Sequence, residues 1–459
     1  MTLKAEQALL FLQQGDLEQA ESLYRQLLHV DSLQPDANLY LGAIAVLQAR
    51  WAEAEVCFRT ALSARPDDAD ALTLLGNALL QLGQIDEAMH CQSRALALAP
   101  DMPEAHRGLG DVWRVQADCS QAIASYERAL TLRPDFPQAA WNLATTLLLA
   151  GEYQRGWALY STRFSACVGV RPIARPSVRQ WWGEPLLPGQ RLLLVAEQGL
   201  GDTLQFMRYL HILEERGIQV CLDAQPPLHN LLKASGIRLE SSACFDADST
   251  NDDGLWAPLL SLPGFLEVGV ERPLLTRPYV HSVDDLVRRW RLTCSGQAVP
   301  IIAIHWQGNP AVEVANLSGR SLPLEAFACV SRCASVRLLS LQKGFGAEQL
   351  ITCSFRQCFV DSQVQVDQAW DFLETVAILA NTDLLITSDS AVAHLAGAMG
   401  HPTWLLLHHV PDWRWGLEGD TTFWYPSMRL FRQREPGNWD ELMQRVATAL
   451  QDYVAARSS

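Results

Sequence analysis

Lysine is almost missing from this chain of 459 residues, which has 33 arginines but only three lysines, Lys4, Lys233 and Lys343. Basic blocks are missing too, and the formal net charge is −15. Binding to a phosphate backbone needs a basic face, so a nucleic-acid partner is not expected. A lysine at the end of a predicted strand, as at Lys343, therefore calls for a specific explanation.

Long apolar runs and paired cysteines are also lacking. No stretch approaches the roughly 20 apolar residues of a membrane span, and the start of the chain has no basic segment followed by an apolar core. The eleven cysteines include no Cys-x-x-Cys pair, so we expect reduced thiols and no zinc site. These absences predict a soluble, cytoplasmic protein without a membrane span. Its length suits two or three domains.

The N-terminal third repeats with a period of 34 residues. Four kinds of position recur in register: Leu41, Leu75, Leu109 and Leu143; Ala20, Ala54, Ala88 and Ala122; Tyr24, Phe58 and Tyr126; Pro66, Pro100 and Pro134. Small residues let two helices pack closely, aromatic residues fill the space between neighbouring pairs, and proline ends the second helix. The period predicts about five helical pairs over residues 1–167.

Stacked helical pairs form a curved groove that can bind a polypeptide. Residues 1–164 carry 12 basic and 20 acidic side chains, which disfavours a strongly acidic partner. Two interpretations stay open. The array either recruits a partner, or it only braces or oligomerises the rest of the chain.

A proline-rich linker, residues 168–190, follows the array, and its Trp181 and Trp182 are expected to pack onto a domain surface. Residues 191–296 then begin with the apolar strand Arg191–Ala196, followed by Gly199, Gly201 and Asp202 at a turn into a helix. Glycines at such a turn let the backbone approach a ligand, and Asp202 is either a helix cap or a catalytic group. The acidic stretch Asp246–Gly254 fails the calcium-loop spacing and is interpreted as a solvated turn.

A second α/β domain is predicted over residues 297–435, with a closing helix in residues 436–459. Its polar candidates follow apolar strands: Gly308 and Asn309 after residues 299–306, Arg320 ahead of a helix, and Lys343 after residues 336–341. Open parallel sheets bind ligands at the carboxyl ends of their strands, so Lys343 and Arg320 could neutralise a diphosphate. Two solvent-exposed cations are the alternative.

The stretch Asp383–Leu407 reads as strand, helix and strand, with Asp389 and Ser390 at the turn into the helix. Both residues are good helix caps, and the amides of residues 391–393 would then point toward a phosphate. His394 lies within the first turn of this helix. An ordinary capped βαβ turn is the alternative interpretation.

Aromatic residues crowd two later loops, residues 413–415 and 424–425. They either stack a nucleotide base or pack the domains together.

Six motifs resemble a known combination in the family's order: EQGLGD (197–202), IHWQGNP (304–310), RSLPL (320–324), SLQKG (340–344), SDSAVAHLAGAMGHP (388–402), and PDWRW with WYPSMRLFRQ near the end. The chain resembles tetratricopeptide-repeat proteins that carry a family 9, heptosyltransferase-like glycosyltransferase module. The resemblance implies a GT-B fold, in which two Rossmann-like domains face each other across a cleft.

The resemblance also implies roles for matching positions. Asp202 would be the general base or would orient the acceptor, and Lys343 would meet the donor diphosphate. The remaining donor-binding candidates are Gly199, Gly201, Gly308, Asn309, Arg320, Asp389, Ser390, Ala391 and His394. Ala391 stands where the family often has glycine. No metal or other cofactor is implied beyond the nucleotide-sugar donor.

The implied activity is inverting, metal-independent glycosyl transfer from a nucleotide sugar to a polypeptide or glycan acceptor held by the repeat groove. Related bacterial fusions include enzymes that glycosylate flagellin. Two alternatives remain: a non-catalytic tetratricopeptide scaffold with a degenerate transferase module, and a lipopolysaccharide or capsule sugar transferase.

Overall fold

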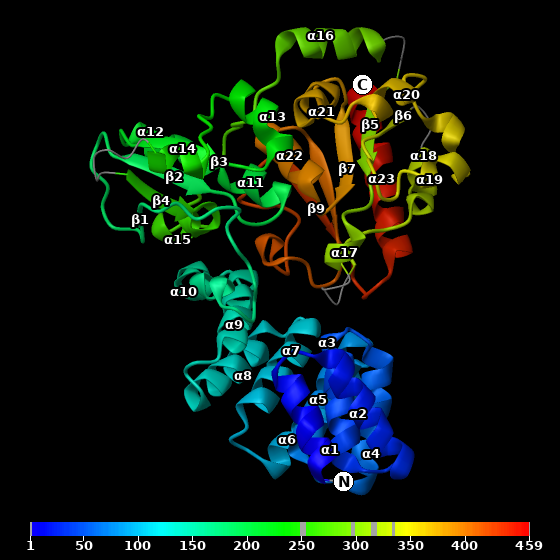
Figure 1. The fold of residues 1–459 in the computed structure, drawn as a ribbon. Coiled ribbons are helices and arrows are strands. Elements are labelled where there is room, and N and C mark those ends of the chain that lie inside the picture. Colours follow the sequence, from blue (N-terminus) through cyan, green and yellow to red (C-terminus); the bar gives the residue numbers. More distant parts are fainter. Residues whose placement is uncertain (1, 248–253, 295–298, 314–318, 333–335, 459) are drawn as a thin grey trace. The chain divides into compact units, whose positions relative to one another are not determined.

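A computed structural model describes residues 2–247, 254–294, 299–313, 319–332 and 336–458 (Figure 1). The chain divides into two compact units, Met1–Leu147 and Leu148–Ser459. The middle of the predicted acidic turn, residues 248–253, lies outside the described residues.

The first unit is a stack of antiparallel helical pairs. Its helices are α1 (Thr2–Gln13), α2 (Leu17–Val30), α3 (Pro35–Leu47), α4 (Trp51–Ala64), α5 (Ala69–Gln81), α6 (Ile85–Leu98), α7 (Pro103–Val115), α8 (Cys119–Leu132) and α9 (Pro137–Leu149). The helices begin where the sequence supplies caps: the side chains of Asp16, Asp68 and Asp118 each accept a hydrogen bond from an amide in the first turn. The predicted helical array is confirmed.

The small and aromatic repeat positions meet as the period predicts. A Cβ added at Gly42 would lie 2.5 Å from Phe58 Cε1, and one added at Gly110 would lie 2.6 Å from Tyr126 Cε1. The third repeat has Gln92 at the aromatic position, fully buried and donating to the Thr73 carbonyl and to Asn77 Oδ1. The same close packing is therefore made there by a polar side chain.

The second unit opens with α10 (Tyr153–Leu159) and a 3-10 helix, η1 (Tyr160–Phe164). A parallel sheet follows with strand order β1-β4-β2-β3. Its strands are β1 (Arg179–Gln180), β2 (Arg191–Val195), β3 (Gln219–Asp223) and β4 (Gly254–Pro258). Its helices are α11 (Leu200–Phe206), α12 (Arg208–Glu215), α13 (His229–Ala234), α14 (Ser242–Ala247) and α15 (Leu262–Phe265). The chain then forms α16 (Asp284–Thr293), whose Arg289 and Trp290 bond Glu374 in the half that contains the second sheet.

The predicted linker is partly built into this first sheet, because β1 pairs with β4 at the sheet edge. Trp181 is buried against Phe265, with ring centroids 5.0 Å apart. Trp182 is 59% exposed, so the expectation that both tryptophans pack is wrong for Trp182. Both tryptophans follow β1, where the Trp181 indole donates to the Glu184 carbonyl, whereas Trp182 is held through its backbone amide, which donates to the Glu184 carboxylate.

A second parallel sheet has the order β6-β5-β7-β8-β9. Its strands are β5 (Ile301–His305), β6 (Arg337–Ser340), β7 (Leu384–Ser388), β8 (Thr403–Leu407) and β9 (Met428–Arg432). Its helices are α17 (Pro310–Glu313), α18 (Ala328–Ser331), α19 (Gln349–Thr352), α20 (Gln363–Gln368), α21 (Phe372–Leu379), α22 (Ala391–Met399) and α23 (Trp439–Ser458). Apolar side chains of α23 join the core of this sheet, as expected for a closing helix. Figure 1 draws α23 beside the strands of the sheet.

Both sheets share a feature that positions ligand sites in open α/β folds. In the second sheet the chain passes from β5 to β6 on one side and then to β7 on the other, so its order reverses between β5 and β7. In the first sheet the equivalent reversal falls between β2 and β4. Ligands of open parallel sheets bind outside the carboxyl ends of the strands at such points.

Candidate functional site

The crevice at the carboxyl ends of β5 and β7 gathers several of the predicted side chains. Ser390 is the residue before α22, and its hydroxyl lies 3.2 Å from His305 Nδ1 at the end of β5. Because this hydroxyl bonds across the crevice, Ser390 makes no side-chain cap to the amides of α22. The first turn of α22 thus presents its amides at the point where the strand order reverses.

Three residues at or after the ends of adjacent strands carry a buried polar atom with no hydrogen-bond partner among the described residues: Ser388 Oγ at the end of β7, His408 Nδ1 after β8, and Trp306 Nε1 after β5, where the ring packs in the hydrophobic core. Burying an unpaired polar group costs free energy, and such groups are rare in folded proteins. Ser388 and Trp306 are completely buried, so a ligand at this edge of the sheet would not contact them directly.

Asp389, next to Ser390, is only 8% exposed. Burial, together with the charge of Asp412, raises the pKa of the Asp389 carboxyl to about 6, and Arg320 opposes the rise. An ionised carboxylate repels phosphate, whereas it accepts hydrogen bonds from hydroxyls readily. Asp389 therefore suits the hydroxyl groups of a ligand better than its phosphates.

His394 lies in the first turn of α22, with Nε2 3.9 Å from Asp389 Oδ1. Burial holds the pKa of His394 well below its usual value, so the ring is neutral near pH 7. Its Nδ1 is 3.0 Å from the Tyr425 hydroxyl, and its ring stacks on Trp415 with centroids 5.5 Å apart. The imidazole is thus held in one orientation from three sides.

Gly201 has a role that the sequence did not suggest. A Cβ at position 201 would lie 2.8 Å from His394 Cδ2 and 3.4 Å from the Ala391 Cα. The first turn of α11 therefore packs directly against the first turn of α22. The lack of a side chain at Gly201 lets the two helices pack this closely. Their N-termini, one from each half of the second unit, are therefore in contact.

Asp202 closes the first turn of α11, where its Oδ2 accepts a hydrogen bond of 2.8 Å from the Gly199 amide. Its Oδ1 forms an ion pair with Arg414, which comes from the loop after β8. Burial raises the pKa of Asp202, and Arg414 counteracts that rise. Asp202 is thus the helix cap considered from the sequence, and it also contacts the half that holds the second sheet, while its catalytic role stays a prediction.

Arg320 and Gly308 lie at the mouth of the same crevice. A Cβ at Gly308 would meet Arg320 Nε and Glu313 Oε1, each at 3.0 Å, so the glycine leaves room for the guanidinium. Arg320 lies 3.7 Å from Glu313, and the Gly308 amide donates to Ser321 Oγ. The carbonyl of Asn309 accepts a hydrogen bond from the amide of Glu313, and this bond closes the turn of α17.

The positive charge of Arg320 acts to lower the pKa of His305, Asp389 and His394, which places Arg320 near all three.

Lys343 lies apart from these residues. Its ammonium donates to the carbonyl of Val366 in α20, and burial lowers the pKa of Lys343 while Asp367 opposes the shift. Among the described residues, no other predicted site residue hydrogen-bonds Lys343. Lys343 remains a predicted diphosphate contact that this structure shows turned toward α20.

The two aromatic loops pack between elements. Trp413 contacts Trp157 and Tyr160, with ring centroids 5.3 Å and 6.0 Å away, while Trp415 lies against His394. Trp424 and Tyr425 are buried as well. Of the two interpretations given from the sequence, the structure favours the packing of domains.

Sequence reasoning missed Arg414, Tyr425 and His305. Arg414 and Asp202 are 212 positions apart, and nothing in either motif indicates a pair. His305 was inside a quoted motif, and its place at a strand end beside the predicted turn was the available signal. A group of three or more His, Cys, Asp or Glu side chains able to hold a metal is not found among the described residues.

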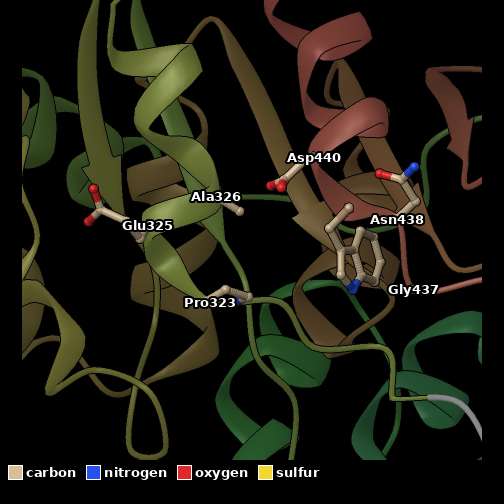
Figure 2. Close-up of a pocket in the computed structure, with 7 residues that line it drawn as sticks. Pro323, Glu325, Ala326, Gly437, Asn438 and Asp440 are labelled. Atoms are coloured by element: carbon tan, nitrogen blue, oxygen red, sulfur yellow. The ribbon is translucent and has the colours of Figure 1, made fainter.

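A hollow of about 380 Å³ opens elsewhere in the second half (Figure 2). It lies between the start of α23 and the 3-10 helix η4 (Leu324–Phe327), with Trp439 and Asp440 on the α23 side. Two of its polar groups are engaged within the protein: Glu325 accepts from Ser354, and Asn438 bonds Glu435 and Glu441. None of the predicted site residues lines it.

Comparison with known proteins identifies the class of the first unit. Tetratricopeptide-repeat family models match residues 45–112, 6–69 and 114–162. The helical array is a tetratricopeptide-repeat array, a module that suggests binding to a protein partner.

Among characterised proteins, the chain is similar to Protein FlbA of Caulobacter vibrioides, with 28% identity over 333 residues. That match covers 68% of this chain and 55% of FlbA, so the chain spans little more than half the length of this relative. Solved structures similar to this chain include MamA, at 21% identity and a TM-score of 0.30 over 34% of this chain and 90% of that one. PilF of Pseudomonas aeruginosa matches at 25% identity and a TM-score of 0.33 over 37% and 77%.

In the part of the chain that the structure describes, no helix is both long and apolar enough to cross a membrane.

Proposed function

We propose that the protein is a glycosyltransferase of the GT-B type that transfers a sugar from a nucleotide-activated donor to a protein or glycan acceptor. The observation that carries the proposal is the crevice between β5 and β7. It combines the first turn of α22 with the cation Arg320 and with the polar side chains of Asp389 and His394. A nucleotide sugar offers both groups that such a crevice can bind, phosphates and hydroxyls.

The proposed donor pose follows from the charges. Phosphate oxygens lie at the amides of Ala391 and Val392, where the positive end of the helix dipole favours an anion. Arg320 adds positive charge, and Lys343 supplies more from the end of β6. Asp389 accepts hydrogen bonds from sugar hydroxyls, and the neutral imidazole of His394 accepts one or donates one to them. In this pose the leaving phosphate is stabilised by fixed dipoles and cations, and no metal is required.

The proposed reaction is a single displacement with inversion. The acceptor oxygen bonds to the anomeric carbon as the bond from that carbon to the phosphate oxygen breaks. The nucleotide leaves with the bonding electron pair. The proton of the acceptor hydroxyl passes to Asp202, which approaches the crevice from the first half of the unit. The repeat array recruits the acceptor, which is a polypeptide of the flagellin type or a glycan.

The test is donor turnover. The purified protein is incubated with UDP-, GDP-, ADP- and CMP-linked sugars, and the released nucleotide is measured with and without candidate polypeptide and lipid-linked glycan acceptors. We expect release from one nucleotide class, and a loss of at least about 100-fold in Asp202→Asn because general-base catalysis contributes roughly 10²–10⁴-fold. Asp361→Asn, which changes an exposed carboxylate paired with Arg337, serves as a matched control and should leave the rate of nucleotide release unchanged.

A second candidate is the non-catalytic scaffold. It is favoured by the engagement of two proposed groups within the protein: Asp202 with Arg414, and Lys343 with Val366. The absence of turnover with every donor, in a folded protein whose array still binds a polypeptide, would select the scaffold. Turnover that requires a lipid-linked glycan would instead select a lipopolysaccharide or capsule transferase.

A further inference from the structure

Arg414 stands at the junction of the two halves of the second unit. It belongs to the 3-10 helix η6 (Trp413–Trp415), after β8 of the second sheet, and its side chain is 8% exposed. Its partners Asp202 and Gln205 belong to α11, which follows β2 of the first sheet. A single guanidinium thus joins the proposed base of one half to the donor crevice of the other.

Every nitrogen of this guanidinium is engaged by the protein. Nε donates to Gln205 Oε1 at 2.6 Å, Nη1 donates to Asp412 Oδ1 at 2.8 Å, and Nη2 pairs with Asp202 Oδ1. The guanidinium carbon lies 4.4 Å from the ring centroid of Trp413 and 5.6 Å from that of Phe206. The side chain is therefore fixed before any ligand arrives.

The charge of Arg414 is retained in this setting. Burial works against the guanidinium charge, but Asp412 and Asp202 more than offset it and raise its pKa. The same pairing acts in the opposite direction on Asp202, whose pKa is raised by burial and by Asp412 and is held down by Arg414. Arg414 is a permanent cation shared between two carboxylates.

The consequence falls on the carboxylate of Asp202. Its Oδ2 is held by the Gly199 amide and its Oδ1 by Arg414, which fixes the orientation of the group. A carboxylate offers about four lone-pair positions, so at least one remains on each oxygen. The side chain is 16% exposed, which leaves those positions reachable.

We propose that Arg414 is a positioning residue: it orients Asp202 as a proton acceptor and forms this acceptor only when the two halves of the unit are in contact. The role of Asp202 as a proton acceptor rests on the proposed function. The pairing itself can be tested without any substrate. Lysine cannot replace arginine here, because one ammonium cannot reach three acceptors arranged around a planar fork.

The first test is a double-mutant cycle on the free, full-length protein with Asp202→Asn, Arg414→Gln and the double variant, measured by urea unfolding at pH 4 and pH 8. We expect a coupling at pH 8 that shrinks at pH 4, because protonation of Asp202 removes its charge. A coupling that does not change with pH would overturn the ion-pair account. Arg432→Gln is the matched control: it braces the same loop through the carbonyls of Trp415 and Gly416 but does not touch Asp202.

The second test uses the nucleotide sugar whose turnover the panel above identifies. In Arg414→Gln the acid limb of the kcat/KM profile should move to higher pH and kcat should fall at least about tenfold. Arg432→Gln should leave the position of that limb unchanged. Arg414→Lys should not rescue kcat. If both arginine variants move the limb equally, Arg414 has only a bracing role and the inference is overturned. If no donor is turned over by the native protein, the proposed function fails, and a pH-independent cycle would then reject the pairing as well.

Discussion

Gly201 and His394 lie in such close contact that a Cβ at position 201 would be 2.8 Å from the imidazole Cδ2. The two residues belong to α11 and α22, so this contact sets how closely the halves of the second unit approach at the candidate site. The neighbouring groups Asp202 and Asp389 are brought to one crevice by the same packing.

Gly201→Ala should therefore separate α11 from α22. Overpacking in a tight contact costs about 1–3 kcal/mol of unfolding free energy, and we expect a loss within that range, measured by urea unfolding. Gly269→Ala is the control, because the nearest atom to a Cβ there is at an ordinary 3.5 Å. Equal stability of the two variants would show that the close approach is not constrained.

Arg163 lies where the strand order of the first sheet reverses, between the ends of β2 and β4. It makes a paired contact with Glu197, with both distances 3.0 Å, and it also donates to Ser261. Both side chains of the ion pair are almost completely buried. The crevice where this sheet would bind a ligand is closed by a residue from η1, which leaves the second sheet as the ligand-binding half.

Breaking this buried pair should be costly and dependent on pH. Burial raises the pKa of Glu197, and Arg163 opposes that rise. When the pKa of a carboxyl is raised in the folded state, the folded protein loses stability as the pH rises from the unfolded-state pKa through the folded-state pKa. Arg163→Gln removes the opposing charge, so the loss should be larger at pH 8 than at pH 4.5, reaching about 3–5 kcal/mol at pH 8.

Thermal and urea unfolding at the two pH values measure this loss. The double variant Arg163→Gln/Glu197→Gln should recover part of the stability at pH 8, since no buried charge is left alone. Arg179→Gln, which removes an exposed ion pair with Glu184 in the same half, should show little change at either pH. A pH-independent loss in Arg163→Gln would contradict the account.

In the array, ion pairs between repeats should matter much less than the aromatic packing. Arg59 pairs with Glu55 in its own helix and with Glu87 of the next repeat, and these side chains are partly exposed. Arg59→Gln should cost less than about 1 kcal/mol, and less still in high salt. Phe58→Ala, at the adjacent fully buried position, should cost about 3–5 kcal/mol. Urea unfolding of both variants provides the comparison, and similar losses would contradict it.

The sequence was sufficient for features that depend on local periodicity. The 34-residue period predicted the helical pairs, and the apolar runs around Leu384 and Thr403 predicted two parallel strands with a helix between them. It was insufficient where distant segments meet. Gly201 was interpreted as ligand-facing because glycine at a strand-to-helix turn often is, yet its constraint comes from a helix almost 200 residues later. The Arg414–Asp202 and Arg163–Glu197 pairs have the same origin in tertiary packing.

The measurement that tests the central claim most directly is calorimetric titration of the purified protein with UDP, GDP, ADP and CMP. It is repeated with Lys343→Ala and with the matched control Lys233→Ala, which removes an exposed lysine in α13. The account predicts micromolar binding of one nucleotide, weakened about tenfold or more in Lys343→Ala and unchanged in Lys233→Ala. A folded native protein that binds none of the four nucleotides would contradict the donor site.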